Sequence, residues 1–250
     1  MKIAIIGFGN LGRALAAGLI KSGCSGAGDL FVCEKSPEAR ILAENEPYFA
    51  RATEDVNAVL EKSDVIFLTV KLYAFEELSA IIDPRFLADK TVISFMAGVP
   101  FEKITSLIGN VRLVRAMPSL AIASCDGVIG YTAAPAEIRD IFNKLGYAFE
   151  TTPENIEKVM AFSSCGLGFA AYLIDAFACA GQSMGFSPET SVRIAAQTFR
   201  NAVERGGFRE TVRAVATPGG ATEQGVLHMD ENDVYGILER AVQRAYEKMT

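Results

Sequence analysis

The N-terminal part of the chain alternates short apolar runs with segments of helical periodicity. The run at residues 64–70 is almost entirely apolar, which is typical of a parallel strand covered on both faces. Leu11, Leu15 and Leu19 follow the first apolar run at helical spacing. The expected strands are residues 2–6, 30–33, 64–70, 90–95, 111–115, 127–132 and 148–151, and the expected helices are 11–21, 73–82, 101–108 and 135–145. This alternation predicts an α/β domain with a doubly wound parallel sheet over residues 1–152.

The pattern changes after residue 152, where strand-like runs end. The expected helices there are residues 154–162, 167–185, 188–206, 208–216, 221–228 and 233–248, with glycine-containing breaks between several of them. Residues 153–250 are therefore predicted to form an all-helical domain. Its long apolar helices need partners, and a second copy of the chain could supply them.

One apolar stretch, residues 164–185, is long enough to be considered as a membrane span. It contains Asp175 and Gln182, and basic flanks are missing. We therefore expect no membrane span but a helix buried in the core or at a subunit interface. Phe162, Phe169 and Phe177 are expected in the core.

Composition narrows the function classes. The net charge of −6, from 24 basic and 30 acidic side chains, argues against a nucleic-acid surface. Five cysteines, an odd number without a CxxC pair, favour a reduced, cytoplasmic protein. A single histidine, His228, predicts no metal site and is expected at the surface or at a helix end. The short N-terminal apolar run leads directly into glycines, so no signal peptide is expected.

A glycine-rich motif, Gly7-Phe8-Gly9-Asn10-Leu11-Gly12, follows the first strand and opens the first helix. In this context GxGxxG predicts a dinucleotide site. Gly7 permits the tight turn, Gly9 lets the backbone approach a pyrophosphate, and Gly12 allows close packing of helix and strand. The helix N-terminus offers N–H groups and a positive dipole end to the phosphates.

Further candidates for cofactor binding lie at the ends of later strands. Glu34 follows the second strand, where an acidic side chain can accept from the ribose 2′-OH of NAD, whereas Lys35 and Ser36 could hold the 2′-phosphate of NADP. The sequence leaves this competition open, so the expected cofactor is NADPH or NADH. Val70-Lys71 and Ala97-Gly98 end two further strands and are expected near the cofactor, although Lys71 could equally be a solvated loop charge.

Five segments together resemble the pyrroline-5-carboxylate reductase family over nearly the whole chain. They are the opening from Ile5 to Gly12, the segment from Ser63 to Lys71, Phe95-Met96-Ala97-Gly98-Val99, Arg115-Ala116-Met117-Pro118 and Ala216-Thr217-Pro218-Gly219-Gly220-Ala221-Thr222. The last is the most specific. GxGxxG alone would fit many dehydrogenases.

The resemblance implies a Rossmann domain followed by a helical dimerisation domain, and therefore a homodimer or larger homo-oligomer. It implies NAD(P)H-dependent reduction of Δ1-pyrroline-5-carboxylate, a small cyclic imino acid, to proline. The substrate pocket would include Met117, Pro118 and the loop Pro218-Gly219-Gly220-Ala221. Thr222 would bind the ring nitrogen as a catalytic residue, and Ser163 would support the pocket.

The chain departs from the family's motifs beside the expected pocket. Ser119-Leu120 stands where the family has Asn-Thr, and Cys165 replaces a small polar residue. These departures leave two alternatives open. The protein could reduce another small cyclic imine or related substrate, or it could be a non-catalytic paralogue that binds dinucleotide.

Overall fold

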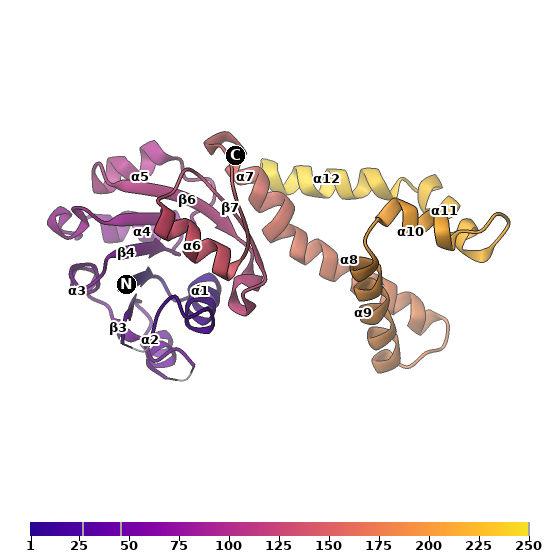
Figure 1. Ribbon diagram of the computed structural model, residues 1–250, viewed down its shortest axis with the longest axis horizontal. Helices are drawn as coiled ribbons and strands as arrows, with labels where there is room; N and C mark the ends of the chain where they lie inside the picture. Colours follow the sequence, from indigo (N-terminus) through magenta and orange to yellow (C-terminus); the bar gives the residue numbers. More distant parts are fainter. Residues whose placement is uncertain (27, 46, 250) are drawn as a thin grey trace. The chain divides into compact units, whose positions relative to one another are not determined.

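The computed structural model describes residues 1–26, 28–45 and 47–249 of the chain (Figure 1). Among these residues, two compact units are present: residues 1–164 together with 246–249, and residues 165–245. The change of sequence pattern at residue 152 lies before the end of the first unit, because the first helical turns after residue 153 belong to that unit.

The first unit is built on one eight-stranded sheet with the order β3-β2-β1-β4-β5-β6-β7-β8. Its strands are β1 (Ile3–Ile6), β2 (Leu30–Cys33), β3 (Arg51–Thr53), β4 (Val65–Leu68), β5 (Thr91–Ser94), β6 (Arg112–Pro118), β7 (Gly127–Tyr131) and β8 (Gly146–Glu150). Strands β1 to β6 are mutually parallel, as the sequence predicts for all of them except β3, which it did not indicate. The predicted Rossmann-type fold class is confirmed.

The last two strands differ in direction from the expected all-parallel sheet. Strand β7 runs antiparallel to β6, and β8 is parallel to β7. The link from β6 to β7 holds only a short 3₁₀ segment, Leu120–Ser124. A parallel return needs a crossover of a dozen or more residues, so this short link returns the chain antiparallel.

Helices cover both faces of the sheet (Figure 1). They are α1 (Asn10–Lys21), α2 (Pro37–Glu44), α3 (Val56–Glu61), α4 (Leu72–Ser79), α5 (Phe101–Ile108), α6 (Ala136–Leu145) and α7 (Ile156–Val159). The sequence pattern missed α2, α3 and β3. Helix α3 has six residues, and its clearest sign is Asp55, whose carboxylate accepts from the backbone N–H groups of Asn57 and Ala58.

Two apolar clusters lie on opposite faces of the sheet, and strand β1 contributes to both. Ile3 and Ile5 pack in the cluster that holds Phe142 of α6, whereas Ile6 packs in the cluster that holds Phe75 of α4. All are fully or almost fully buried. Each such side chain contributes roughly 1.5–3 kcal/mol by leaving water. This double burial fixes where β1 ends, and so where the glycine motif begins.

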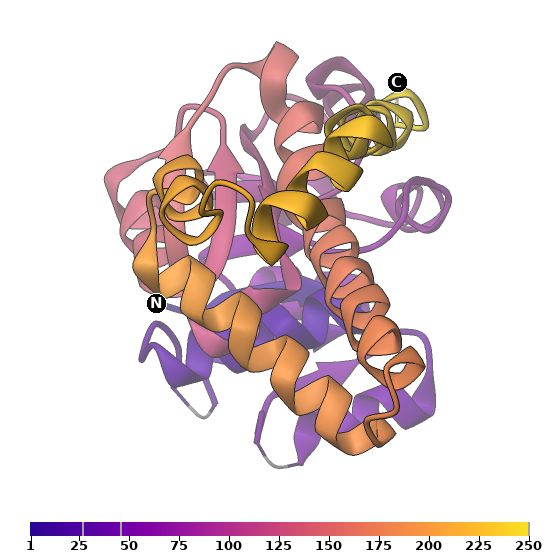
Figure 2. The same ribbon diagram turned by 90° about the vertical axis from the view of Figure 1, so that its right-hand side faces the viewer.

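The second unit contains only helices in its described residues. They are α8 (Cys165–Ser183), α9 (Pro188–Arg205), α10 (Phe208–Val215), α11 (Ala221–Glu231) and α12 (Val234–Glu247), the last of which ends in the first unit. Helices α8 and α9 lie side by side, with the rings of Phe177 and Phe199 in edge contact at 5.9 Å (Figures 1 and 2). The break expected between residues 162 and 167 is absent, since a π-helical turn, Met160–Ser164, continues α7 into α8.

The helical unit leaves much of its apolar surface exposed. The prediction that Phe162 and Phe177 belong to the core is wrong for the single chain, because they are 76% and 45% exposed. Periodicity indicates that a helix face is apolar, but it does not say what covers that face. The helix Pro153–Ser183 is long and apolar enough to cross a membrane by length and composition, and few of its residues are buried.

Candidate functional site

The carboxyl ends of β1, β2 and β4 meet where the strand order of the sheet reverses. Ligands of open α/β sheets bind at this switch point. A hollow of about 350 Å³ lies here. Its lining residues are Gly7, Cys33, Glu34, Lys35, Glu54, Val70, Ala74, Glu77, Leu78 and Ile81. Four of them, Gly7, Glu34, Lys35 and Val70, were predicted from the sequence.

The glycines of the first turn meet different backbone constraints. Gly7 has a φ of +99°, and a Cβ there would lie 2.6 Å from Cγ1 of Val70. A Cβ on Gly12 would lie 2.2 Å from the backbone oxygen of Gly7. A Cβ on Gly9 would meet nothing within 4 Å. Gly7 and Gly12 are thus required by the turn itself, whereas the space beside Gly9 is open to a ligand.

Helix α1 begins directly behind this open space. Its N-cap is Gly9, which has no side chain to satisfy the first N–H groups. Asn10 is exposed, with its side-chain oxygen accepting from Arg13, and Leu11 is half-buried. Phe8 is buried with its ring on Tyr48 at 5.2 Å, so only its backbone can serve the turn. Uncapped N–H groups and the helix dipole suit an anionic group.

Thr69, which the sequence analysis did not single out, fixes the turn from the neighbouring strand. Its hydroxyl lies 2.7 Å from the backbone oxygen of Gly7 and 3.0 Å from that of Ile6. The available signal was its position directly after β4, beside the motif. Val70 follows and packs against Gly7, whereas Lys71 is exposed at the start of α4 and is not among the lining residues of the hollow.

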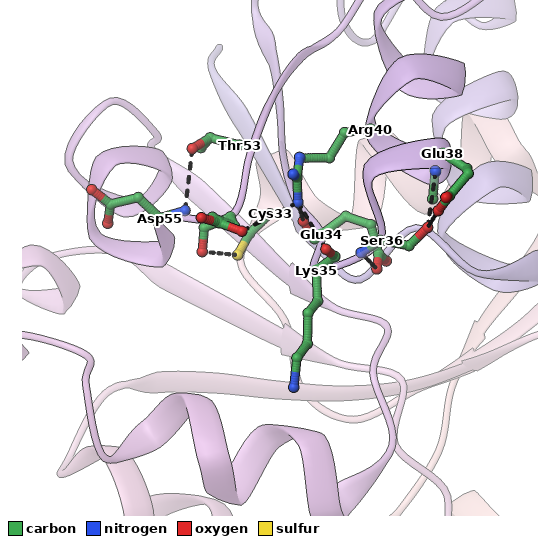
Figure 3. A network of polar contacts seen from close by, with 10 residues as sticks. Cys33, Glu34, Lys35, Ser36, Glu38, Arg40, Thr53 and Asp55 are labelled. Atoms are coloured by element: carbon green, nitrogen blue, oxygen red, sulfur yellow. Dashed lines mark hydrogen bonds and ion pairs between the residues drawn. The ribbon is translucent and has the colours of Figure 1, made fainter.

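Glu34 turns its carboxylate back onto the protein backbone. Oε2 accepts from the N–H of Phe8 at 2.7 Å. Oε1 accepts from the N–H of Ser36 at 2.9 Å (Figure 3). The carboxylate thereby joins the glycine turn to the loop after β2. It remains half-buried at the edge of the hollow, where it can still accept from a hydroxyl.

The neighbours of Glu34 are themselves bound to acidic groups or to backbone. The Ser36 hydroxyl donates to Glu38 at 2.7 Å, and this hydrogen bond lowers the pKa of Glu38 (Figure 3). Arg40 donates to the backbone oxygens of Glu34 and Lys35, and it lies 3.6 Å from a carboxylate oxygen of Glu54. Lys35 reaches Glu77 at 3.8 Å through a 92% exposed side chain.

Cys33 ends β2 on the wall of the hollow. Burial, with the charges of Glu34 and Asp55, raises its pKa to about 12, although Arg40 acts in the other direction. The thiol donates to the backbone oxygen of Glu54 at 3.7 Å. It is therefore a neutral group that contributes shape rather than charge.

The loop after β5 is held by a buried ion pair. Arg115 of β6 donates to Oε1 of Glu157 at 2.5 Å and to the backbone oxygen of Met96 at 3.3 Å. The same Glu157 oxygen accepts from the N–H of Gly98 at 3.2 Å. Ala97 is half-buried and Gly98 is exposed with a φ of +65°. The sequence analysis missed Glu157, whose partners lie far away along the chain.

The candidates for the substrate pocket within the first unit are mostly covered. Met117 is 1% exposed, and Pro118 is buried with its oxygen accepting from the Ser164 hydroxyl. Ser163 donates to the backbone oxygen of Val159 at 2.8 Å and lines a hollow beside β8. Its role at a pocket remains a prediction.

The segment from Pro218 to Thr222 lies in the helical unit. Gly219 has a φ of +74°, and its N–H donates to Glu223 at 2.7 Å. Gly220 is the N-cap of α11 without a side-chain cap, and Ala221 and Thr222 are exposed in the first helical turn. This turn repeats the chemistry of the α1 N-terminus, with N–H groups and a helix dipole available to an anion.

Other chemistry is sparse in the part of the chain that the structure describes. No group of three or more potential ligands could hold a metal ion among these residues. His228 is 79% exposed on α11, as expected of a surface histidine, with Glu231 at 4.0 Å. The five cysteines are free thiols.

Comparison with known proteins follows this division of the chain. Residues 153–250 match the family model described as pyrroline-5-carboxylate reductase dimerisation, and residues 2–98 match NADP oxidoreductase, coenzyme F420-dependent. A pyrroline-5-carboxylate reductase of Aquifex aeolicus is 29% identical over 99% of this chain and 96% of its own length. One of Staphylococcus saprophyticus is 25% identical with the same coverage.

A solved structure supports the fold independently. The Plasmodium falciparum pyrroline carboxylate reductase, determined with NADP bound, superposes with a TM-score of 0.89 at 23% identity, covering 100% of this chain and 97% of that one. The agreement spans both the sheet and the helices. The C-terminal part of the chain thus matches the pyrroline-5-carboxylate reductase dimerisation family, and the chain is similar over its full length to pyrroline-5-carboxylate reductases.

Proposed function

We propose that the protein reduces Δ1-pyrroline-5-carboxylate to proline with a nicotinamide dinucleotide. The observation that carries the cofactor part is the uncapped start of α1 behind Gly9, at the switch point of the sheet. The full-length similarity to pyrroline-5-carboxylate reductases supports the substrate.

The residues at the switch point suit a dinucleotide without rearrangement. Gly9 leaves room for a pyrophosphate, and the first N–H groups of α1 can donate to it. Glu34 can accept from a ribose hydroxyl. Ala97 and Gly98 offer backbone with little side-chain bulk to the nicotinamide end. When bound, the reduced nicotinamide supplies a hydride.

We assign the substrate's polar groups to the first turn of α11. The N–H groups of Gly219, Gly220 and Ala221 are proposed to hold the ring carboxylate, with the proviso that the Gly219 N–H must leave Glu223. Thr222 is proposed to hydrogen-bond the ring nitrogen. Met117, Pro118 and Ser163 are proposed to support the pocket, through backbone in the case of the buried Met117.

The chemistry needs orientation more than a strong acid. A pyrroline nitrogen is basic enough to be protonated in water, which makes its carbon electrophilic before binding. The protein must then fix the carboxylate and the nitrogen so that the carbon faces the hydride donor. The candidate residues fit this requirement, because they offer hydroxyl and N–H donors. His228, the chain's single histidine, lies exposed on α11.

We further propose a cytoplasmic homodimer or larger homo-oligomer. The match of residues 153–250 to a dimerisation family and the exposed apolar side chains of α8 to α12 support it. The same match favours a second protein chain, rather than lipid, as the cover of the apolar helix Pro153–Ser183. Free thiols suit a reducing compartment.

One experiment tests the reaction and its main alternatives. Purified protein is mixed with Δ1-pyrroline-5-carboxylate and NADH or NADPH, and both nucleotide oxidation and proline are measured. A six-membered cyclic imine and a thia-substituted one serve as competitors, because the exposed Leu120 stands at a departure from the family motif. Proline formation that depends on both substrates supports the proposal. Faster turnover of another imine, or no turnover of any imine in the panel, contradicts the proposal.

A further inference from the structure

The sequence leaves open whether the loop after β2 recognises NAD or NADP. The structure shows which side chains of this loop are available to bind a 2′-phosphate. An NADP site needs cations and hydrogen-bond donors that are free to meet a 2′-phosphate. Three groups near the loop could meet that need: the Lys35 ammonium, the Arg40 guanidinium and the Ser36 hydroxyl with its N–H.

Two of these residues, Ser36 and Arg40, direct their donors elsewhere. The Ser36 N–H donates to Glu34, and its hydroxyl donates to Glu38 (Figure 3). The Arg40 guanidinium bridges the backbone oxygens of Glu34 and Lys35, with Glu54 beside it. Moving either side chain toward a phosphate would break hydrogen bonds that shape the loop, because Arg40 is held through Nη1 and Ser36 through its N–H and its hydroxyl.

The charges around the loop also disfavour a 2′-phosphate. Four carboxylates, those of Glu34, Glu38, Glu54 and Glu77, stand against the two cations Lys35 and Arg40. Lys35 is the cation with freedom to move, and its nearest partner is Glu77 at 3.8 Å. A 2′-phosphate would bring further negative charge beside Glu34, whereas a 2′-hydroxyl would donate to it.

We propose that this protein selects NADH over NADPH, with Glu34 as the principal specificity-determining residue and Glu38 and Glu77 as supporting ones. The inference rests on the proposed function, since it concerns the cofactor of the same site. It separates this chain from the Plasmodium falciparum relative, whose structure holds NADP.

The test is direct binding, which does not depend on turnover. Isothermal titration of the full-length protein with NADH and with NADPH gives two dissociation constants. We expect NADH to bind at least about tenfold more tightly, as one desolvated like-charge contact can produce. The ratio should shrink as ionic strength rises, because salt screens the repulsion.

Two variants locate the effect. Glu34→Gln should shift the ratio toward NADPH by about tenfold. Because Glu34 also holds the glycine turn, the double variant Glu38→Gln/Glu77→Gln is made as well, since it leaves that turn untouched while removing the negative charges beside Ser36 and Lys35. It should tighten NADPH binding by more than it changes NADH binding, because the charges that it removes repel the 2′-phosphate of NADPH. Glu102→Gln, an exposed carboxylate in the first turn of α5, is the control and should change neither.

The outcomes distinguish a failure of the proposed cofactor preference from a failure of the proposed reaction. Equal or tighter binding of NADPH by the natural protein, or an unchanged ratio in both the Glu34 and the double variants, overturns the inference while the proposed reaction stands. Binding of neither nucleotide refutes the proposed function and this inference with it.

Discussion

Arg115 and Glu157, 42 positions apart in the chain, form a buried ion pair that holds the backbone of the loop after β5. Their side chains are 4% and 13% exposed. Glu157 binds the Gly98 N–H and Arg115 binds the Met96 oxygen, so the pair links β6, α7 and that loop. The Arg115 Nε has no hydrogen-bond partner among the described residues, so Glu157 is central to compensating this buried charge.

Removing Glu157 should therefore be costly. We expect Glu157→Ala to lower the free energy of unfolding by about 3–5 kcal/mol, because it leaves the Arg115 guanidinium buried without its counter-charge. Urea unfolding measures the loss. Glu76→Ala, which breaks the more exposed pair with Lys103, is the matched control and should cost about 1 kcal/mol or less. Equal losses in the two variants would show that the buried pair has no special role.

The glycine turn offers a pair of variants that separate folding from binding. Gly9→Ala has space for its methyl group and should cost at most about 1 kcal/mol of stability, yet it should weaken NADH binding strongly. Gly12→Ala forces a methyl group against the Gly7 oxygen and should destabilise the fold by about 1–3 kcal/mol. Thermal unfolding and nucleotide titration distinguish them. Normal NADH affinity in Gly9→Ala would place the pyrophosphate elsewhere.

Thr222 tests the substrate end. It is exposed in the first turn of α11, so Thr222→Ala should leave unfolding unchanged. If Thr222 bonds the charged ring nitrogen, kcat/KM should fall by roughly 10- to 100-fold, which corresponds to about 1.5–3 kcal/mol. Nucleotide binding should not change, and Thr222→Ser should restore most activity because it keeps the hydroxyl. Full activity in the alanine variant would remove Thr222 from the reaction.

Cys33 should resist alkylation in the folded protein. With its pKa raised to about 12 by burial and by Glu34, the thiol stays protonated at pH 8, so iodoacetamide should modify it only after unfolding. Between pH 9 and 12 the unfolded chain loses this proton while the folded chain keeps it, so stability should fall as pH rises. Cys33→Ala should remove that part of the slope. Peptide mass spectrometry and urea titration give the two measurements.

Much of the fold was predictable because parallel strands buried on both faces leave continuous apolar runs. Strands β1, β2, β4 and β5 can be recognised in the sequence by such runs. Strand β3 does not, since its three residues, Arg-Ala-Thr, are only partly buried. The antiparallel turn of β7 was hidden as well, because an apolar run carries no direction. The direction of β7 could have been inferred from the short connection between β6 and β7.

The candidate site, like the fold, could be predicted from the sequence only in part. The glycine turn was visible in the sequence because its three glycines lie within six consecutive residues. The choice between NAD and NADP was not, because it depends on where Glu34 and Arg40 direct their side chains in space. Thr69 and Glu157 act across neighbouring strands and helices, and no spacing in the sequence marks such contacts.

The sparse burial of the helical unit has a consequence for how the protein behaves on dilution. Helices α10, α11 and α12 contain no buried residue, and α8 and α9 together contain three. In the proposed homo-oligomer, order in this part would depend on association, so its melting temperature should rise with protein concentration, while the sheet with its own interior melts independently of it. A mutation that weakens association would act first as a folding defect.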